Sequence, residues 1–175
     1  MMRIFLIGFM GSGKTTIGKI LAQRLDWSFV DMDVFIEKKY FKTIAQLFDE
    51  KGENGFREIE HQALLEVAEF EHTVISTGGG TPFFFNNMEI MTTKGLCIYL
   101  QLSVDELAIR LQSAKIERPL IREKTAEELY DYIVKTLHKR EPFYKKASLS
   151  IDCNTKSIHE LIKLILDTIT PMIAH

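Results

Sequence analysis

The chain has 175 residues, of which 46% are hydrophobic and 26% charged, and its formal net charge is -2. This length suits one globular domain with a continuous core and argues against a second full domain. Because no net positive charge is available to gather phosphate backbones, we expect no nucleic-acid partner. No apolar run approaches the roughly 18 residues of a membrane span, so we expect no membrane association and a cytoplasmic protein.

Short apolar runs alternate with longer amphipathic stretches along the chain. This pattern is typical of βαβ units, and it predicts an α/β fold with a parallel sheet covered by helices on both faces. Strands are expected at residues 3–8, 28–31, 73–76, 96–102 and 149–152. Helices are expected at residues 14–25, 34–40, 43–51, 53–70, 86–91, 104–111, 126–146 and 157–169. Residues 113–124 are rich in Lys and Arg, contain Pro119, and are expected to form a mobile surface excursion.

The segment GFMGSGKT at residues 8–15 fits the phosphate-loop pattern G-x-x-x-x-G-K-[ST], and it lies between a predicted strand and a predicted helix. Its glycines allow backbone N–H groups to turn toward a phosphate, next to the positive end of the helix dipole. A plain glycine-rich turn is the alternative, but a chance match in such a chain is on the order of one in a hundred. The predicted nucleotide-binding residues here are Gly11, Ser12, Gly13, Lys14, Thr15 and Thr16.

The second predicted strand ends in Asp31-Met32-Asp33. Two carboxylates would then lie at the carboxyl edge of the sheet, where open α/β folds bind ligands. One carboxylate can serve Mg²⁺ and the other can take the proton of an accepting hydroxyl. Alternatively, Asp33 only caps a helix and Asp31 is a solvated strand end. No Asn-Lys-x-Asp pattern occurs, and strands 72–76 and 96–102 contain no acidic residue, which disfavours a regulatory GTPase.

Five motifs follow one another in the chain: Asp31-x-Asp33; Ile44, Phe48 and Gly52-Glu53-x-x-Phe56-Arg57-x-x-Glu60; Gly78-Gly79-Gly80; Arg118-Pro119-Leu120; and Arg140 with Tyr144. In this order they resemble the shikimate kinase family, from the phosphate loop to the last helix. The resemblance implies a three-layer P-loop kinase fold whose five-stranded parallel sheet has the order 2-3-1-4-5. It also implies a single kinase domain with an acceptor-binding subdomain at residues 32–61 and a lid at residues 112–124.

The resemblance further implies transfer of the γ-phosphate of Mg-ATP to the 3-hydroxyl of shikimate. Asp33 would face the shikimate hydroxyls, Gly79 would offer a backbone N–H, and Arg57 and Arg140 would hold the carboxylate. Planar guanidinium groups match a carboxylate better than an ammonium does, which independently favours an acidic acceptor. The predicted catalytic residues are Lys14, Asp33 and Arg118, the predicted Mg²⁺ ligands are Thr15 and Asp31, and the further nucleotide contacts are Arg110, Arg118 and Lys156.

Several questions stay open at this point. Phe83-Phe84-Phe85 departs from the family pattern and is expected either to pack in the core or to reshape the acceptor pocket, whereas Phe48 and Phe56 are expected to form its apolar wall. Glu60 could orient Arg57, reach the water shell of the metal, or form a solvated pair. A kinase for gluconate or a nucleoside monophosphate and a nucleotide-dependent switch are the alternative functions. Acceptor-dependent release of ADP separates them.

The cysteines and histidines carry no predicted chemistry. Cys97 and Cys153 have neither metal-ligand nor disulfide spacing, and we expect both to be reduced packing residues. The five histidines are scattered and show no metal-ligand spacing. We expect the protein to be a monomer.

Overall fold

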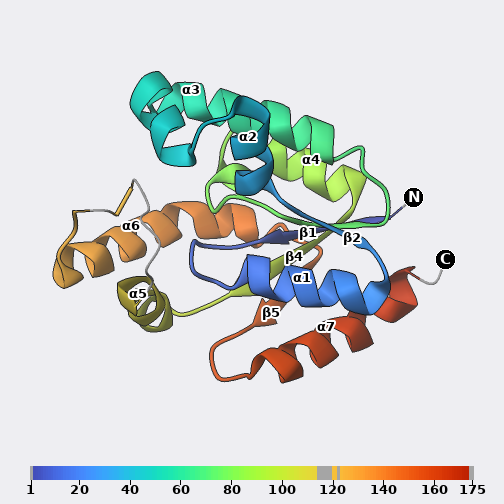
Figure 1. Cartoon of the computed structure of the whole chain (residues 1–175). Helices are drawn as coiled ribbons and strands as arrows, with labels where there is room; N and C mark the ends of the chain where they lie inside the picture. The colour runs from blue at the N-terminus through green and yellow to red at the C-terminus, as the bar shows by residue number, and fades with distance from the viewer. Residues whose placement is uncertain (1, 114–119, 122, 174–175) are drawn as a thin grey trace.

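The computed structural model describes residues 2–113, 120–121 and 123–173. Its centre is a five-stranded parallel sheet in the order β2-β3-β1-β4-β5 (Figure 1). The predicted fold class and strand order are therefore confirmed. The strands are β1 (Arg3–Ile7), β2 (Ser28–Asp31), β3 (Thr73–Ser76), β4 (Leu96–Gln101) and β5 (Leu149–Asp152).

Helices cover both faces of this sheet. Figure 1 shows α1 and α7 on one side of it and α2, α3 and α4 on the other. The helices are α1 (Lys14–Leu25), α2 (Met32–Tyr40), α3 (Ile44–Val67), the 3-10 helix η1 (Thr81–Phe83), α4 (Asn87–Lys94), α5 (Val104–Ser113), α6 (Ala126–Tyr144) and α7 (Ile158–Ile173). Within the described ranges, none of these helices has the length and apolar content needed to cross a membrane.

The strand side chains divide the core into two halves, because successive residues of a strand point to opposite faces. In β1, Ile4 and Leu6 pack with residues of α1 and α7, whereas Phe5 and Ile7 pack with residues of α2, α3 and α4. All four side chains are fully buried. The continuous apolar sequence of the strand is what a sheet covered on both faces requires.

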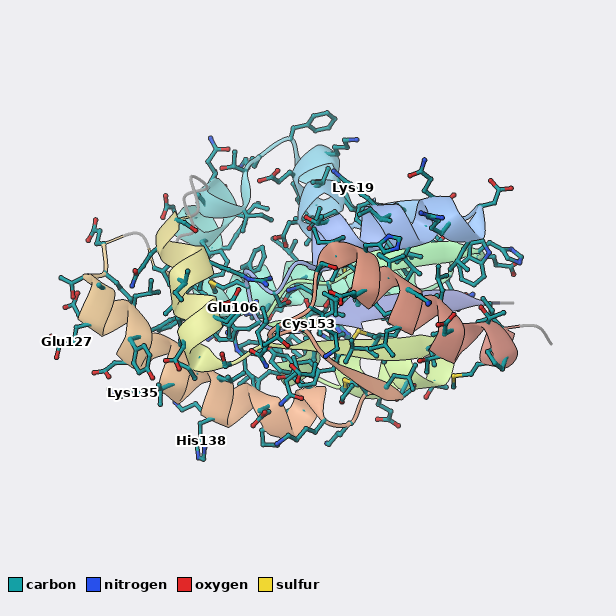
Figure 2. The ribbon with its side chains drawn as sticks, turned by 90° about the horizontal axis from the view of Figure 1, so that it is seen from below. Lys19, Glu106, Glu127, Lys135, His138 and Cys153 are labelled. Atoms are coloured by element: carbon teal, nitrogen blue, oxygen red, sulfur yellow. The ribbon has the colours of Figure 1, made fainter. Side chains whose placement is uncertain are left out.

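Both cysteines are free and buried, as expected for packing residues. Cys97 belongs to β4, and Cys153 follows β5 in the body of the molecule (Figure 2). Burial raises the pKa of the Cys97 thiol to about 12 and that of the Cys153 thiol to about 11. Both sulfurs are therefore protonated and unreactive at neutral pH.

The start of α2 differs from the predicted start at residue 34, and the cause is Asp31. The carboxylate of Asp31 accepts hydrogen bonds from the backbone N–H groups of Asp33 (3.0 Å) and Val34 (3.4 Å). It thereby caps the helix two residues earlier. The interpretation of Asp33 as the cap is wrong, and Asp33 lies in the first turn of the helix and not on the strand.

The predicted break between segments 43–51 and 53–70 is present, because α3 is kinked at Gly52. This residue has a non-helical φ of 66° and ψ of 179°, a conformation that glycine adopts without a Cβ clash. Helix α7 continues through Pro171 to Ile173, beyond the predicted end at residue 169. The short helix η1 was not predicted, and it shapes the loop that follows β3.

Candidate active site

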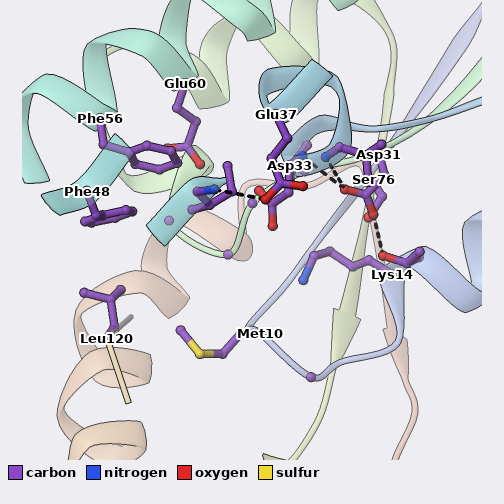
Figure 3. Close-up of a pocket in the computed structure, with 18 of the residues that line it drawn as sticks. Met10, Lys14, Asp31, Asp33, Glu37, Phe48, Phe56, Glu60, Ser76 and Leu120 are labelled. Atoms are coloured by element: carbon purple, nitrogen blue, oxygen red, sulfur yellow. Dashed lines mark hydrogen bonds between the residues drawn. The ribbon is translucent and has the colours of Figure 1, made fainter. Parts of the chain in front are cut away.

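A cavity of about 660 Å³ opens where the loops after β1, β2 and β3 meet (Figure 3). Parallel strands bring their carboxyl ends to one edge of the sheet, and open α/β folds bind ligands there. Figure 3 shows Asp31 and Asp33 on one side of the cavity and Phe48, Phe56 and Leu120 on the opposite side. The rings of Phe48 and Phe56 stack with their centroids 4.3 Å apart. The cavity therefore has a carboxylate side and an apolar side.

The phosphate loop connects β1 to α1 along this cavity. Gly11 and Gly13 have φ angles of 82° and 91°, in the left-handed region that residues with a Cβ rarely adopt. The Lys14 ammonium donates to the backbone carbonyls of Gly8 (2.9 Å) and Phe9 (2.8 Å), so it lies over the loop. Of the predicted nucleotide-binding residues, Gly11, Gly13, Lys14, Thr15 and Thr16 line the cavity, and the buried Ser12 contacts Lys14.

Thr15 and Asp31, the predicted Mg²⁺ ligands, are in direct contact. The Thr15 hydroxyl donates to Asp31 Oδ2 at 2.6 Å, and both residues line the cavity. Mg²⁺ in nucleotide sites is usually held by one or two carboxylates together with substrate phosphates and water. A hydroxyl and a carboxylate beside the phosphate loop fit that donor set.

Asp33 reaches the cavity from the first turn of α2. Its Oδ1 atom lies 3.6 Å from the position that a Cβ would take on Gly78, the first glycine after Thr77 in the loop following β3. Glu37, one turn later on α2, lines the same cavity, and its Oε1 accepts a hydrogen bond from the backbone N–H of Ile44 (3.0 Å). Asp33 and the glycines that follow β3 therefore lie beside each other at the cavity.

Arg57 lines the cavity from α3 and is only 4% exposed, which is unusual for arginine. Its Nη1 donates to Glu60 at 2.9 Å and its Nη2 to Glu53 at 3.2 Å. Its Nε is a buried donor without a hydrogen-bond partner in the part of the chain that the structure describes. A buried unsatisfied donor costs about 1–3 kcal/mol, so an anionic ligand oxygen that reached it would be stabilised.

Glu60 orients Arg57 and is not a solvated residue, because it is 1% exposed. One carboxylate oxygen accepts the Arg57 hydrogen bond, and the other accepts a hydrogen bond from the Thr81 hydroxyl at 2.7 Å. Both oxygens are thus engaged inside the protein. The sequence left open whether Glu60 acts on Arg57 or on a metal, and these contacts favour Arg57.

Arg140 reaches the cavity from α6 and is 5% exposed. One turn later, the buried Tyr144 hydroxyl donates to the carbonyl oxygen of Gly79 at 2.5 Å. Burial raises the pKa of Tyr144 to about 12, although the positive charges of Arg140 and Arg57 act in the opposite direction. Arg140 and Arg57 line the same cavity. The sequence identified Tyr144 only as part of a motif, and no pattern in the sequence predicted its hydrogen bond to Gly79.

Gly79 packs directly against the phosphate loop. A Cβ on Gly79 would lie 3.0 Å from the backbone nitrogen of Met10 and 3.5 Å from the carbonyl oxygen of Gly8. These separations leave almost no space for a side chain. The glycine loop after β3 and the phosphate loop after β1 therefore meet through their backbones.

Two of the remaining predicted nucleotide contacts, Arg110 and Lys156, lie outside the cavity lining. Arg110 donates to Glu106 at 2.7 Å, and its Nη1 lies 3.8 Å from the position of a Cβ on Gly13. Lys156 follows β5. Burial raises the pKa of the Cys153 thiol, and the positive charges of Arg110 and Lys156 act in the opposite direction. Arg118 lies outside the described residues, as do residues 114–119 and 122 of the predicted lid.

The three phenylalanines after the glycine loop do not line the cavity, and they have different surroundings. Phe83 packs edge-on against Phe143 with the centroids 5.0 Å apart. Phe84 lies against Arg57, with the guanidinium carbon 4.4 Å from the ring centroid. Phe85 is 58% exposed. Neither core packing nor reshaping of the pocket describes all three.

Among the histidines, His61 is in contact with the residues around the site. Its Nδ1 lies 2.5 Å from Asn87 Oδ1, and its ring packs against Phe85. His138, in contrast, lies on the outer side of α6 and points away from the molecule (Figure 2). No feature of the sequence distinguishes these two histidines.

The strand order, the phosphate loop and the arginine-lined cavity beside it together define a P-loop kinase. A family model described as shikimate kinase matches residues 10–170. The chain belongs to the shikimate kinase family, as the sequence motifs predicted.

Individual relatives agree with this assignment. A shikimate kinase of Parabacteroides distasonis is 53% identical over 152 residues, which cover 87% of this chain and 88% of that protein. The crystal structure of shikimate kinase from Bacteroides thetaiotaomicron has a TM-score of 0.91 at 43% identity and covers 97% of this chain and 98% of that one. Shikimate kinase from Acinetobacter baumannii in complex with shikimate has a TM-score of 0.89 at 33% identity, covering 100% of this chain and 96% of that one.

Proposed function

We propose that this protein transfers the γ-phosphate of ATP to the 3-hydroxyl of shikimate, in the biosynthesis of chorismate and aromatic amino acids. The observation that carries the proposal is one cavity with a phosphate loop and two nearly buried arginines, Arg57 and Arg140. Two guanidinium groups suit the carboxylate of a hydroxy acid. The shikimate complex of the A. baumannii relative, which shares family and fold with this chain, supports the same acceptor.

The chemistry needs positioning and charge, because phosphoryl transfer leaves little covalent work to the protein. Asp33, beside the glycine loop, would orient the accepting hydroxyl and take its proton as the hydroxyl oxygen attacks the γ-phosphorus in line with the leaving ADP. Arg57, Arg140 and the backbone N–H of Gly79 would hold the acceptor. Lys14 would stabilise the charge of the β- and γ-phosphates.

Thr15 and Asp31 would hold Mg²⁺, which supplies positive charge to the phosphates when it is bound with the nucleotide. Arg118, from the predicted lid, would add a further positive charge at the phosphates. Arg110 and Lys156 would contact the nucleotide on the far side of the phosphate loop. Residues 32–61, the predicted acceptor-binding subdomain, contribute Asp33 and Arg57 to the cavity, which supports that division. We propose that the protein is a monomer. We also propose that it acts in the cytoplasm, because ATP is available there.

Release of ADP, measured in a coupled assay, tests the proposal. Shikimate should stimulate ADP release in the presence of Mg²⁺, whereas gluconate and nucleoside monophosphates should leave it at the acceptor-free rate. Asp33→Asn keeps the shape of the side chain and removes the base, so it should bind both substrates and lose most of its turnover. Stimulation by another hydroxy acid and not by shikimate would leave only the fold assignment standing.

A further inference from the structure

The loop from Gly80 to Phe84 has no part in the mechanism above, yet it contacts Arg57, which is proposed to hold the acceptor. A Cβ on Gly80 would lie 2.7–2.8 Å from the guanidinium atoms of Arg57, so the loop backbone lies directly against that group. Thr81 reaches Arg57 through Glu60, and the ring of Phe84 lies on the guanidinium. We propose that Thr81 and Phe84 are positioning residues that set the orientation in which Arg57 meets the acceptor carboxylate.

Thr81 acts on Arg57 by holding the carboxylate between them. Its hydroxyl donates to Glu60 Oε1 at 2.7 Å, and Glu60 Oε2 accepts from Arg57 Nη1 at 2.9 Å. A carboxylate held at both oxygens cannot rotate freely, so the direction of the Arg57 hydrogen bond is fixed. Thr81 and Glu60 are 0% and 1% exposed, and in a dry setting such hydrogen bonds are strong.

Thr81 is itself held in place from behind. Asn87 Nδ2 donates to the backbone carbonyl of Thr81 at 2.9 Å, and Asn87 Oδ1 lies 2.5 Å from His61 Nδ1. Asn87 is fully buried. A chain of polar contacts therefore runs from His61 through Asn87, Thr81 and Glu60 to Arg57, and it ends at the cavity.

Phe84 fixes a different degree of freedom, the tilt of the guanidinium plane. Its ring centroid lies 4.4 Å from the guanidinium carbon, nearer than those of Phe56 (5.4 Å) and Phe48 (5.7 Å). Arginine is attracted to aromatic faces, and more strongly where water is excluded. Phe84 in turn packs edge-on against Phe83 with the centroids 5.1 Å apart.

The inference rests on the proposed function. Calorimetric titration of purified full-length variants with shikimate and with ATP tests the inference. Thr81→Val keeps the shape and removes the hydroxyl, so we expect the shikimate Kd and KM to rise about tenfold, as for a lost hydrogen bond to a charged group. The ATP Kd should be unchanged and kcat should change less than threefold. Thr81→Ser restores the hydroxyl and should restore the shikimate Kd.

Phe84→Leu should raise the shikimate Kd about threefold to tenfold, and Phe83→Leu is its matched control. The control loses a neighbouring ring of the same size that reaches Arg57 only through Phe84, so its shikimate Kd should rise clearly less than that of Phe84→Leu. The methyl ester of shikimate, which lacks the anionic carboxylate, gives a second readout. If Thr81 and Phe84 act through Arg57, the ester should bind the wild type and the variants equally weakly.

Three outcomes would overturn the inference: an unchanged shikimate Kd in Thr81→Val and Phe84→Leu, equal weakening of ATP and shikimate, or equal effects on shikimate and its ester. Should Thr81→Val fail to fold, the comparison of Phe84→Leu with Phe83→Leu decides the question alone. A wild-type protein that neither binds nor phosphorylates shikimate overturns the proposed function as well. Normal wild-type turnover with unaffected variants overturns only the inference.

Discussion

Neutralising Glu60 tests the central electrostatic feature of the acceptor site, the buried pair that it forms with Arg57. In Glu60→Gln the amide can still accept from Arg57 and contact Thr81, so shape and hydrogen bonding are largely kept and the negative charge is lost. The side chains of Arg57 and Glu60 are only 5% and 2% exposed. The arginine would therefore keep its charge in a place that water scarcely reaches.

The magnitude follows from this burial. Removing one partner of a buried ion pair destabilises a protein by about 3–5 kcal/mol, because the other charge is left uncompensated. Glu53 still contacts Arg57 Nη2 at 3.2 Å, so we expect the lower end, about 3 kcal/mol. For a chain of this length that corresponds to a Tm lower by about 6–12 °C. The shikimate Kd should rise as well, since Arg57 loses one of its supports.

Glu53→Gln is the matched control, because it removes the same charge from the same arginine. The side chain of Glu53 is 49% exposed, and half-exposed pairs of this kind contribute about 0–1 kcal/mol. Thermal and urea unfolding of the two variants measure the contrast. Equal losses in both variants, or a Glu60→Gln protein as stable as the wild type, would refute the argument from burial.

Three further predictions concern the same molecule. Arg57→Lys keeps the charge but loses the planar guanidinium. Calorimetry should show that shikimate binds more weakly by about 1.5–3 kcal/mol, while ATP binding is unchanged. An equal loss of ATP binding would contradict the role of Arg57 as a contact for the acceptor alone. Arg118→Ala should lower kcat by roughly 10³-fold or more while its ATP Kd in the absence of shikimate stays near normal, whereas Lys14→Ala should weaken ATP binding as well. A near-normal kcat would make Arg118 a surface charge. The thiols of Cys97 and Cys153 have pKa values of about 12 and about 11, so at pH 8 roughly one molecule in 10⁴ and one in 10³ carries the thiolate. A thiol reagent should therefore label these cysteines only after the protein unfolds. Rapid labelling of the native protein would contradict their burial.

The sheet could be predicted from the sequence because its signal is local. Strands β2, β3 and β5 begin and end at the predicted residues, since each is a short segment with two apolar residues that lies between helical patterns. The predicted start of α2 was two residues too late, because the sequence suggested that Asp31 only ends the strand. In the structure the Asp31 side chain caps the helix. The break at Gly52 in α3 could be predicted, because glycine is unfavourable inside a helix and readily adopts the non-helical φ and ψ found there.

The acceptor site could be predicted only in part. Arg57 and Arg140 were expected to hold one carboxylate, and the structure brings both to one cavity, although only the family resemblance linked them. The roles of Thr81, Phe84 and Tyr144 had no sequence signal. Each contacts a segment distant in the chain, and a hydroxyl or a phenyl ring at one position does not identify its partner.

In the proposed reaction, the contact between Gly79 and the phosphate loop would set the spacing of the two substrates. In-line transfer requires the attacking oxygen to approach within about 3–3.5 Å of the phosphorus, and the rate falls steeply when that approach is lengthened. Here the two loops meet through their backbones, so in the proposed reaction this distance would depend on backbone contacts and not on adjustable side chains. Even a methyl group at position 79 would act as a wedge a few tenths of an ångström thick, separating donor from acceptor while each remained bound in its own half of the site.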